Sequence, residues 1–160
     1  MAAEFYVTIE GTKQGALTGE SVRPRHEGAL AGLAFHYSVA HPRDAGSGMA
    51  TGRRIHQPIS FVKEWGAASP QIFQALVTNE TIKSAVFEFV RTADTGEEIV
   101  FHRIKVSSAR VTEIEQFIDD SDLAPTGKGL EKISLVFQRI EIENLDGNTS
   151  ATDDVTKGGR

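Results

Sequence analysis

Most segments of the chain alternate hydrophobic and polar positions with a period of two, which is the pattern of half-buried β-strands. The expected strands cover residues 5–10, 33–39, 59–61, 82–91, 99–106, 109–117 and 130–145. The segment 82–91 is apolar on both faces, so we expect it to be covered on two sides. In 130–145 the apolar positions change from odd to even numbers after Phe137. This change predicts a bulge, or a strand that passes from one buried face to another.

One segment has helical periodicity instead. Ser69 and Pro70 are typical of a helix start, because a serine hydroxyl caps the first turn and proline lacks an N–H group that this turn leaves unpaired. An apolar stripe follows on one face, and Asn79 is a suitable end. The stripe consists of Ile72, Phe73, Leu76 and Val77. We therefore predict a helix at about residues 69–79 that leans this stripe on the outside or the end of a barrel.

Two regions do not fit the strand pattern. The stretch from His41 to Gly52 contains three glycines and one proline, which predicts a long loop that is functional or disordered. Residues 146–160 are small, polar and acidic, so we expect a flexible C-terminal tail there. The remaining residues, 1–145, are interpreted as a single domain.

Composition narrows the functional classes. The 160 residues suit one domain, and the net charge of −5 disfavours nucleic acid, with no basic stripe beyond Arg53 and Arg54. The absence of cysteine excludes disulfides and thiolate chemistry. The first residues are unlike a signal peptide, and no apolar run approaches a membrane span. We expect synthesis in the cytoplasm, no membrane insertion, and any export by a route that does not read an N-terminal signal.

The chemistry-bearing side chains do not form a recognisable active site. The histidines are scattered without metal-ligand spacing, at positions 26, 36, 41, 56 and 102. We therefore expect no enzyme, no cofactor and no metal. A hydrolase built from His36, Ser38 and a distant aspartate is one alternative, and a monomeric barrel that holds a small ligand in its mouth is another.

Several motifs together resemble the haemolysin-coregulated protein family, the tube-forming component of type VI secretion. They are Gly-x-x-Ile-His-x-Pro from Gly52, Phe-x-Lys from Phe61, and Ser-Pro before the helix. The residues that carry them are Ile55, His56, Pro58, Phe61, Lys63, Ser69 and Pro70. The resemblance extends over nearly the whole chain up to about Leu145.

The resemblance implies a compact β-barrel of two antiparallel sheets flanked by one helix. It implies homo-hexameric rings that stack into a hollow tube, are enclosed by a contractile sheath, and are secreted with a spike into the medium or a target cell. It also implies that effector proteins are carried in the ring lumen, which His36 and Ser38 are expected to face. The long loop is expected to pack between rings or neighbouring subunits through Arg43, Asp44, Gly46, Gly48, Met49, Arg53 and Arg54. A subunit of a bacteriophage-type tail tube is an alternative within the same architecture.

One position departs from the family pattern. Family members commonly carry an acidic residue shortly before the Ser-Pro helix start, where this chain has Trp65 to Ala68. An exposed Trp65 would indicate an interface, and a buried one would fill the end of the barrel.

Overall fold

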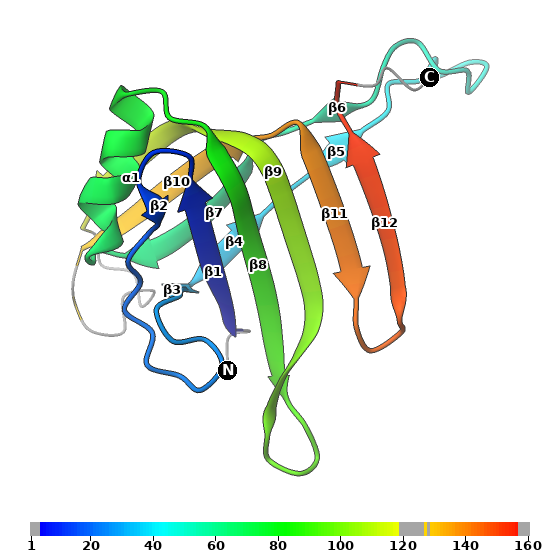
Figure 1. Cartoon of the computed structure of the whole chain (residues 1–160). Helices are drawn as coiled ribbons and strands as arrows, with labels where there is room; N and C mark the ends of the chain where they lie inside the picture. Colours follow the sequence, from blue (N-terminus) through cyan, green and yellow to red (C-terminus); the bar gives the residue numbers. More distant parts are fainter. Residues whose placement is uncertain (1–3, 119–126, 128, 157–160) are drawn as a thin grey trace.

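A computed structural model describes residues 4–118, 127 and 129–156 as a mainly β protein with one short helix (Figure 1). In chain order the elements are β1 Glu4–Gly11, β2 Gly15–Ala16, β3 Leu30–Gly32, β4 Ala34–His36, β5 Val39–Ala40, β6 Ile55–His56, β7 Ile59–Glu64, α1 Ala68–Val77, β8 Ile82–Thr92, β9 Glu98–Phe117, β10 Leu130–Val136, β11 Arg139–Asn144 and β12 Thr149–Asp154. Within the described residues no helix is long and apolar enough to cross a membrane.

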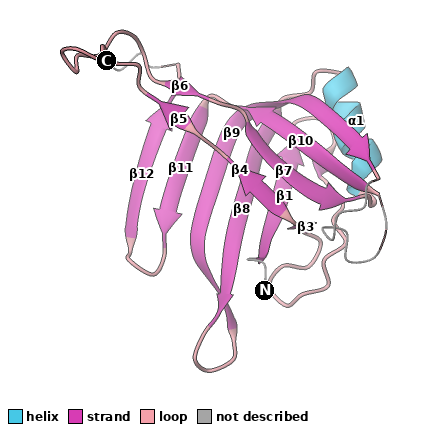
Figure 2. Ribbon diagram, turned by 180° about the vertical axis from the view of Figure 1, so that it is seen from behind, coloured by secondary structure: helices cyan, strands magenta, loops and turns pink. Residues whose placement is uncertain are grey.

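The long strand β9 joins two layers. Its first half pairs with β8 and β11, and its second half pairs with β10. Layer A contains β2 and β3 beside β1, followed by β8, the first half of β9, β11 and β12. Layer B contains the second half of β9, then β10, β7 and β4. Figure 2, seen from behind, shows β7 and β10 running obliquely across β1 and β8.

The chain passes between the two layers at two neighbouring places, a kink within β9 and the short break between β10 and β11. Ser108 interrupts β9 with a φ of 51°, and β10 ends at Val136 before β11 begins at Arg139. The change of phase in 130–145 is therefore confirmed as a passage from layer B to layer A. The prediction of separate strands at 99–106 and 109–117 was wrong, because β9 keeps pairing on both sides of its kink.

The layers do not close into the compact barrel that we expected. In the described part of the chain, β4 pairs only with β7 at one end of layer B, and β12 pairs only with β11 at one end of layer A. The core lies between the layers and includes Val7, Phe61, Phe87 and Ile133, each at most 1% exposed. Hydrophobic side chains therefore fill the interior, although the sheet edges remain open.

The helix and the C-terminus correct two further predictions. Ala67, not Ser69, occupies the N-cap position, and it makes no side-chain capping bond. Phe73 and Val77 are 55% and 59% exposed, so only part of the predicted apolar stripe packs on the core. The expected flexible tail instead contains β12, which pairs along its whole length with β11. Its polar sequence gave no hydrophobic alternation, because the strand is held mainly by its backbone.

Candidate functional site

The outer face of layer B is the first candidate surface. On β7, Ile59, Phe61 and Lys63 point into the protein, so the alternate residues Ser60 and Val62 lie on the opposite face. The strand register extends this face into two rows across the layer. One row contains His36, Ser60, Ser134 and Glu113, and the other contains Ala34, Val62, Lys132 and Glu115.

The centre of this face combines Ser60, Val62 and Ser134, of which Ser134 is only 8% exposed, and charged side chains lie toward β9. The structure places His36 and Ser38 as exposed residues, His36 within the first row and Ser38 just beyond β4. Among the described residues, no carboxylate lies within ion-pair distance of His36, so the hydrolase alternative lacks its third member there. Ser60 and Ser134 were not predicted to lie on this face. The alternation of β7 and β10 does indicate it, because each serine stands between two residues that point into the core.

The long loop is a second candidate surface, and it projects from the body beyond β5 and β6 (Figure 1). An isolated bridge joins Arg43 to Ala50, and Arg43 donates to the Gly48 carbonyl at 3.2 Å. Asp44 accepts hydrogen bonds from the Ser47 N–H and hydroxyl, both at 2.8 Å. Gly48 has a φ of 73°, which a residue with a side chain rarely adopts. The loop is thus ordered by its own contacts, and its solvent-exposed residues include Gly46, Met49 and Arg53.

A polar cluster joins the base of this loop to the C-terminal strand. The Arg54 guanidinium donates to both carboxylate oxygens of Asp153, at 2.5 and 2.6 Å. His56 Nε2 lies 2.7 Å from Asp153 Oδ2, and the Tyr37 hydroxyl lies 2.7 Å from His56 Nδ1. The hydrogen bonds from Arg54, supported by His56, lower the pKa of Asp153 to about 2 although partial burial opposes the shift. We call Tyr37, Arg54, His56 and Asp153 the loop-base cluster.

A second cluster is buried where the helix begins. Lys63 and Glu131 lie opposite each other on β7 and β10, with Nζ 2.6 Å from Oε1, and are 3% and 0% exposed. The Ser69 hydroxyl donates to Glu131 at 2.8 Å and accepts the Gly66 N–H at 3.0 Å. Ser69 therefore ties the helix start to both strands rather than capping the helix.

The remaining motif residues have simpler roles. Phe61 belongs to the core, at 1% exposure, whereas Ile55, Pro58 and Pro70 are exposed. Pro70 lies in the first helical turn, where its missing N–H breaks no bond. Most of the motif thus builds the frame that carries the two exposed surfaces.

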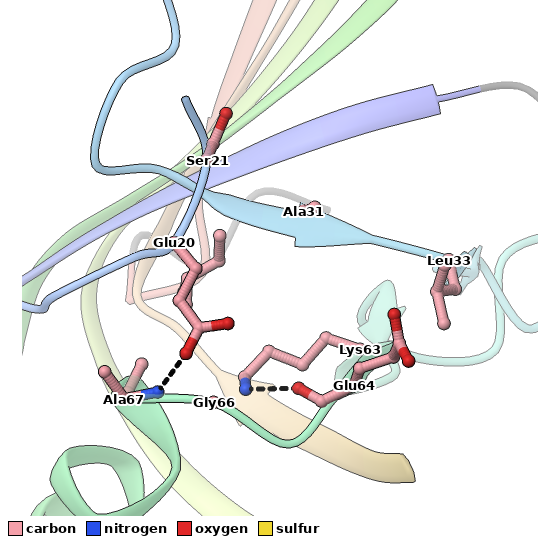
Figure 3. A pocket seen from close by; sticks show the side chains of 10 residues that line it. Glu20, Ser21, Ala31, Leu33, Lys63, Glu64, Gly66 and Ala67 are labelled. Atoms are coloured by element: carbon pink, nitrogen blue, oxygen red, sulfur yellow. Dashed lines mark hydrogen bonds between the residues drawn. The ribbon is translucent and has the colours of Figure 1, made fainter. Parts of the chain in front are cut away.

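Trp65 is half-buried and closes one end of layer B. Its Nε1 donates to the Leu130 carbonyl at 2.8 Å, and its ring lies over Gly129. A pocket of about 140 Å³ lies nearby, between the helix start and β3 (Figure 3). Two of its polar groups already have partners, since Glu20 accepts the Ala67 N–H at 2.8 Å and Lys63 donates to the Glu64 carbonyl at 2.9 Å. These contacts stabilise the helix start.

The interior does not provide the open mouth that a ligand-binding barrel needs. Phe35 packs against Phe5 and Phe87 with ring centroids 5.9 and 5.1 Å apart, and Phe61 lies 5.4 Å from Phe87. No group of three or more potential metal-ligand side chains gathers within the described residues.

Comparison with known proteins identifies the family. The family model described as "Type VI secretion system effector, Hcp" matches residues 6–143. The "Major exported protein" of Pseudomonas aeruginosa is 27% identical over 165 residues, which cover 96% of each chain. A crystal structure of an Hcp protein has a TM-score of 0.87 at 26% identity, covering 96% of this chain and 99% of that one. The Hcp1 protein from E. coli EAEC 042 has a TM-score of 0.86 at 27% identity, with the same coverage. The chain therefore belongs to the Hcp family of exported type VI secretion proteins.

Proposed function

We propose that this chain is the ring subunit of a type VI secretion inner tube. Six copies form a ring, the rings stack inside a contractile sheath, and the tube is ejected with a spike protein. The chain leaves the cell through this machine and carries effector proteins in the lumen. No turnover chemistry is required of it. The subunit acts as one domain, which extends beyond the expected boundary at residue 145 to include β12.

The observation that supports this proposal is the open form of layer B. In the described residues, this layer ends on one side in β4 and on the other in the part of β9 from Arg110 to Phe117, which pairs only with β10. Unpaired strand edges attract other strands, so a neighbouring copy is a suitable occupant for each edge. A ring closed in this way turns the face bearing His36 and Ser60 toward its centre. A small, polar and charged lining there holds folded cargo without burying large apolar surfaces.

Electron microscopy and native mass spectrometry of the purified protein test the ring. We expect hollow rings and a species of six chain masses. A protein that stays monomeric at high concentration would contradict the proposal.

The absence of cysteine allows the lumen to be tested by labelling. We expect the variant His36→Cys to react in assembled rings with a small maleimide but not with a maleimide-linked polymer wider than the pore. The control variant Thr152→Cys, on exposed β12, should react with both reagents if that strand faces outward. Equal polymer labelling at both positions, in rings seen by microscopy, would contradict the assignment of this face to the lumen.

A further inference from the structure

Both ends of the long loop converge on one carboxylate. Tyr37 precedes the loop and His56 follows it, and their side chains meet at 2.7 Å. His56 also bonds to Asp153 at 2.7 Å. Asp153 therefore contacts the segment after the loop directly and is linked through His56 to Tyr37, which lies before the loop. Figure 1 shows β5, β6 and the end of β12 on the same side of the molecule.

The geometry of this junction is well defined. Arg54 presents two parallel N–H groups to the two oxygens of Asp153 and also donates to the Asp154 carbonyl at 3.1 Å. A forked guanidinium pair of this kind fixes orientation as well as distance. The His56 side chain is 7% exposed and lies edge-on to Phe137, with ring centroids 5.5 Å apart. The imidazole is therefore held from three sides, by Tyr37, Phe137 and Asp153.

The rest of the loop is tied mainly to itself. The Asp44 N–H bonds to the Met49 carbonyl at 2.7 Å, and the Thr51 N–H bonds to the Pro42 carbonyl at 3.0 Å. His41 Nε2 lies 3.0 Å from the Gly52 carbonyl oxygen. These internal bonds make residues 41–52 a stiff arm. Its direction depends on the base, where the two-residue pairing of β5 with β6 is short.

The end of β12 is itself anchored to the body. Asp153 pairs with Ile140 of β11, and the Val155 N–H bonds to the Gln138 carbonyl at 2.7 Å. Gln138 lies at the turn between layers B and A, between β10 and β11. The carboxylate is thus fixed relative to the core, and the loop base is fixed relative to the carboxylate.

We infer that Asp153 is a positioning residue that acts through Arg54 and His56 to set the direction in which the loop leaves the body. The C-terminal strand then determines how each subunit presents its loop to the next copy. The second statement rests on the proposed function and on the expectation, from the family resemblance, that this loop packs between rings or neighbouring subunits. The first concerns a single subunit and stands independently.

The inference is tested by measuring the loop direction with pairs of spin labels. Because the chain has no cysteine, labels are placed only at introduced positions, one at Ala45 in the loop and one at Thr78 after the helix. Asp153→Asn places an NH₂ donor opposite the donors of Arg54. We expect a narrow distance distribution in the parent and a broader, shifted one in D153N. Arg54→Lys keeps the charge without the fork, so it should broaden the distribution as well.

The matched control is Asp146→Asn. Asp146 also accepts two bonds from one arginine, Arg91, at 2.9 and 3.0 Å, but at the opposite end of the same hairpin. D146N should leave the loop distribution unchanged. An unchanged distribution in D153N would overturn the inference. The inference would also be overturned if D153N broadened the distance distribution between Thr78 and a third label at Lys83 by the same amount, since both positions lie outside the loop and the whole fold would then be loosened. Whether the parent protein forms rings tests the proposed function separately. The positioning role of Asp153 and the ring-subunit function can therefore fail independently.

Discussion

Removing one partner of the buried Lys63–Glu131 pair should destabilise the protein far more than replacing both partners. Lys63 and Glu131 are 3% and 0% exposed, and their charged atoms lie 2.6 Å apart. The variants are Lys63→Met, Glu131→Leu and the double variant. Each single variant leaves the opposite charge buried without its counter-ion, whereas the double variant leaves an apolar pair of similar size.

The expected magnitudes follow from this burial. Loss of one partner of a buried pair costs about 3–5 kcal/mol. K63M should fall at the low end, because Glu131 keeps hydrogen bonds from Ser69 at 2.8 Å and from Gln116 at 3.2 Å. In E131L the Lys63 ammonium keeps the Glu64 carbonyl at 2.9 Å, and Ser69 at 3.3 Å. We expect the double variant to lose at least about 2 kcal/mol less than the sum of the two single losses.

Urea unfolding, followed by circular dichroism, measures the free energy of unfolding of the parent and of each of the three variants. All samples need the same protein concentration, because assembly raises the apparent stability of the folded chain. The exposed pair Arg91–Asp146, with both side chains 45% exposed, is the control, and its alanine variants should each lose less than about 1 kcal/mol. Additive losses in the Lys63–Glu131 cycle, with a coupling energy below about 0.5 kcal/mol, would refute the reasoning.

Other contacts give three further predictions. Asp153 has a pKa of about 2 in the folded chain and about 3.9 when unfolded. It therefore stabilises the protein by about 1–2 kcal/mol at neutral pH, allowing for its 30% exposure, and this advantage over D153N should vanish as the pH falls from about 4 to below 2 in urea titrations. Gly129→Ala brings a Cβ to 2.3 Å from the Trp65 ring, so the fluorescence of this single tryptophan should shift to longer wavelength. Glu80 is 2% exposed and accepts the N–H groups of Lys13 and Gln14, both at 2.9 Å, so Glu80→Gln should lower the unfolding free energy by about 1–3 kcal/mol. An unchanged stability in E80Q, an unshifted emission in G129A, or a pH-independent effect of D153N would contradict the respective prediction.

Strands with one buried face could be predicted from the sequence because their apolar residues record which side meets the core. Phe5, Val7 and Ile9 are at most 3% exposed, as their alternation in β1 indicates, although Tyr6 on the opposite face is also buried, at 5% exposure. The same pattern could not show that β9 continues through Ser108. A kink within one strand and a gap between two strands interrupt the pattern in the same way, and only the distant pairing partners distinguish them.

The loop-base cluster could not be predicted for a related reason. β12 has the sequence Thr-Ser-Ala-Thr-Asp-Asp, and its residues Thr149 to Thr152 are exposed. Backbone bonds to β11 hold such an edge strand in place, so its side chains carry no periodic signal. Asp153 is 97 residues away from His56, and nothing local relates the two. The motif singled out His56 in the sequence, but its partner Asp153 could be identified only from the folded structure.

The alternation of β7 predicts that Lys63 is buried, but it does not predict which residue neutralises its charge. Lys63 follows Ile59 and Phe61 on the buried face of β7, so alternation alone places a charged side chain in the core. A buried ammonium requires a counter-ion, and the register of layer B supplies Glu131 from the adjacent strand. The sequence thus predicts the need for a partner, while the pairing of strands selects it. Internal pairs of this kind stabilise the sheet. The outward residues on the same strands, such as Ser60 beside His36, take no part in the packing of the core. Those outward positions can therefore vary without loss of the fold, as the proposed carrier role requires.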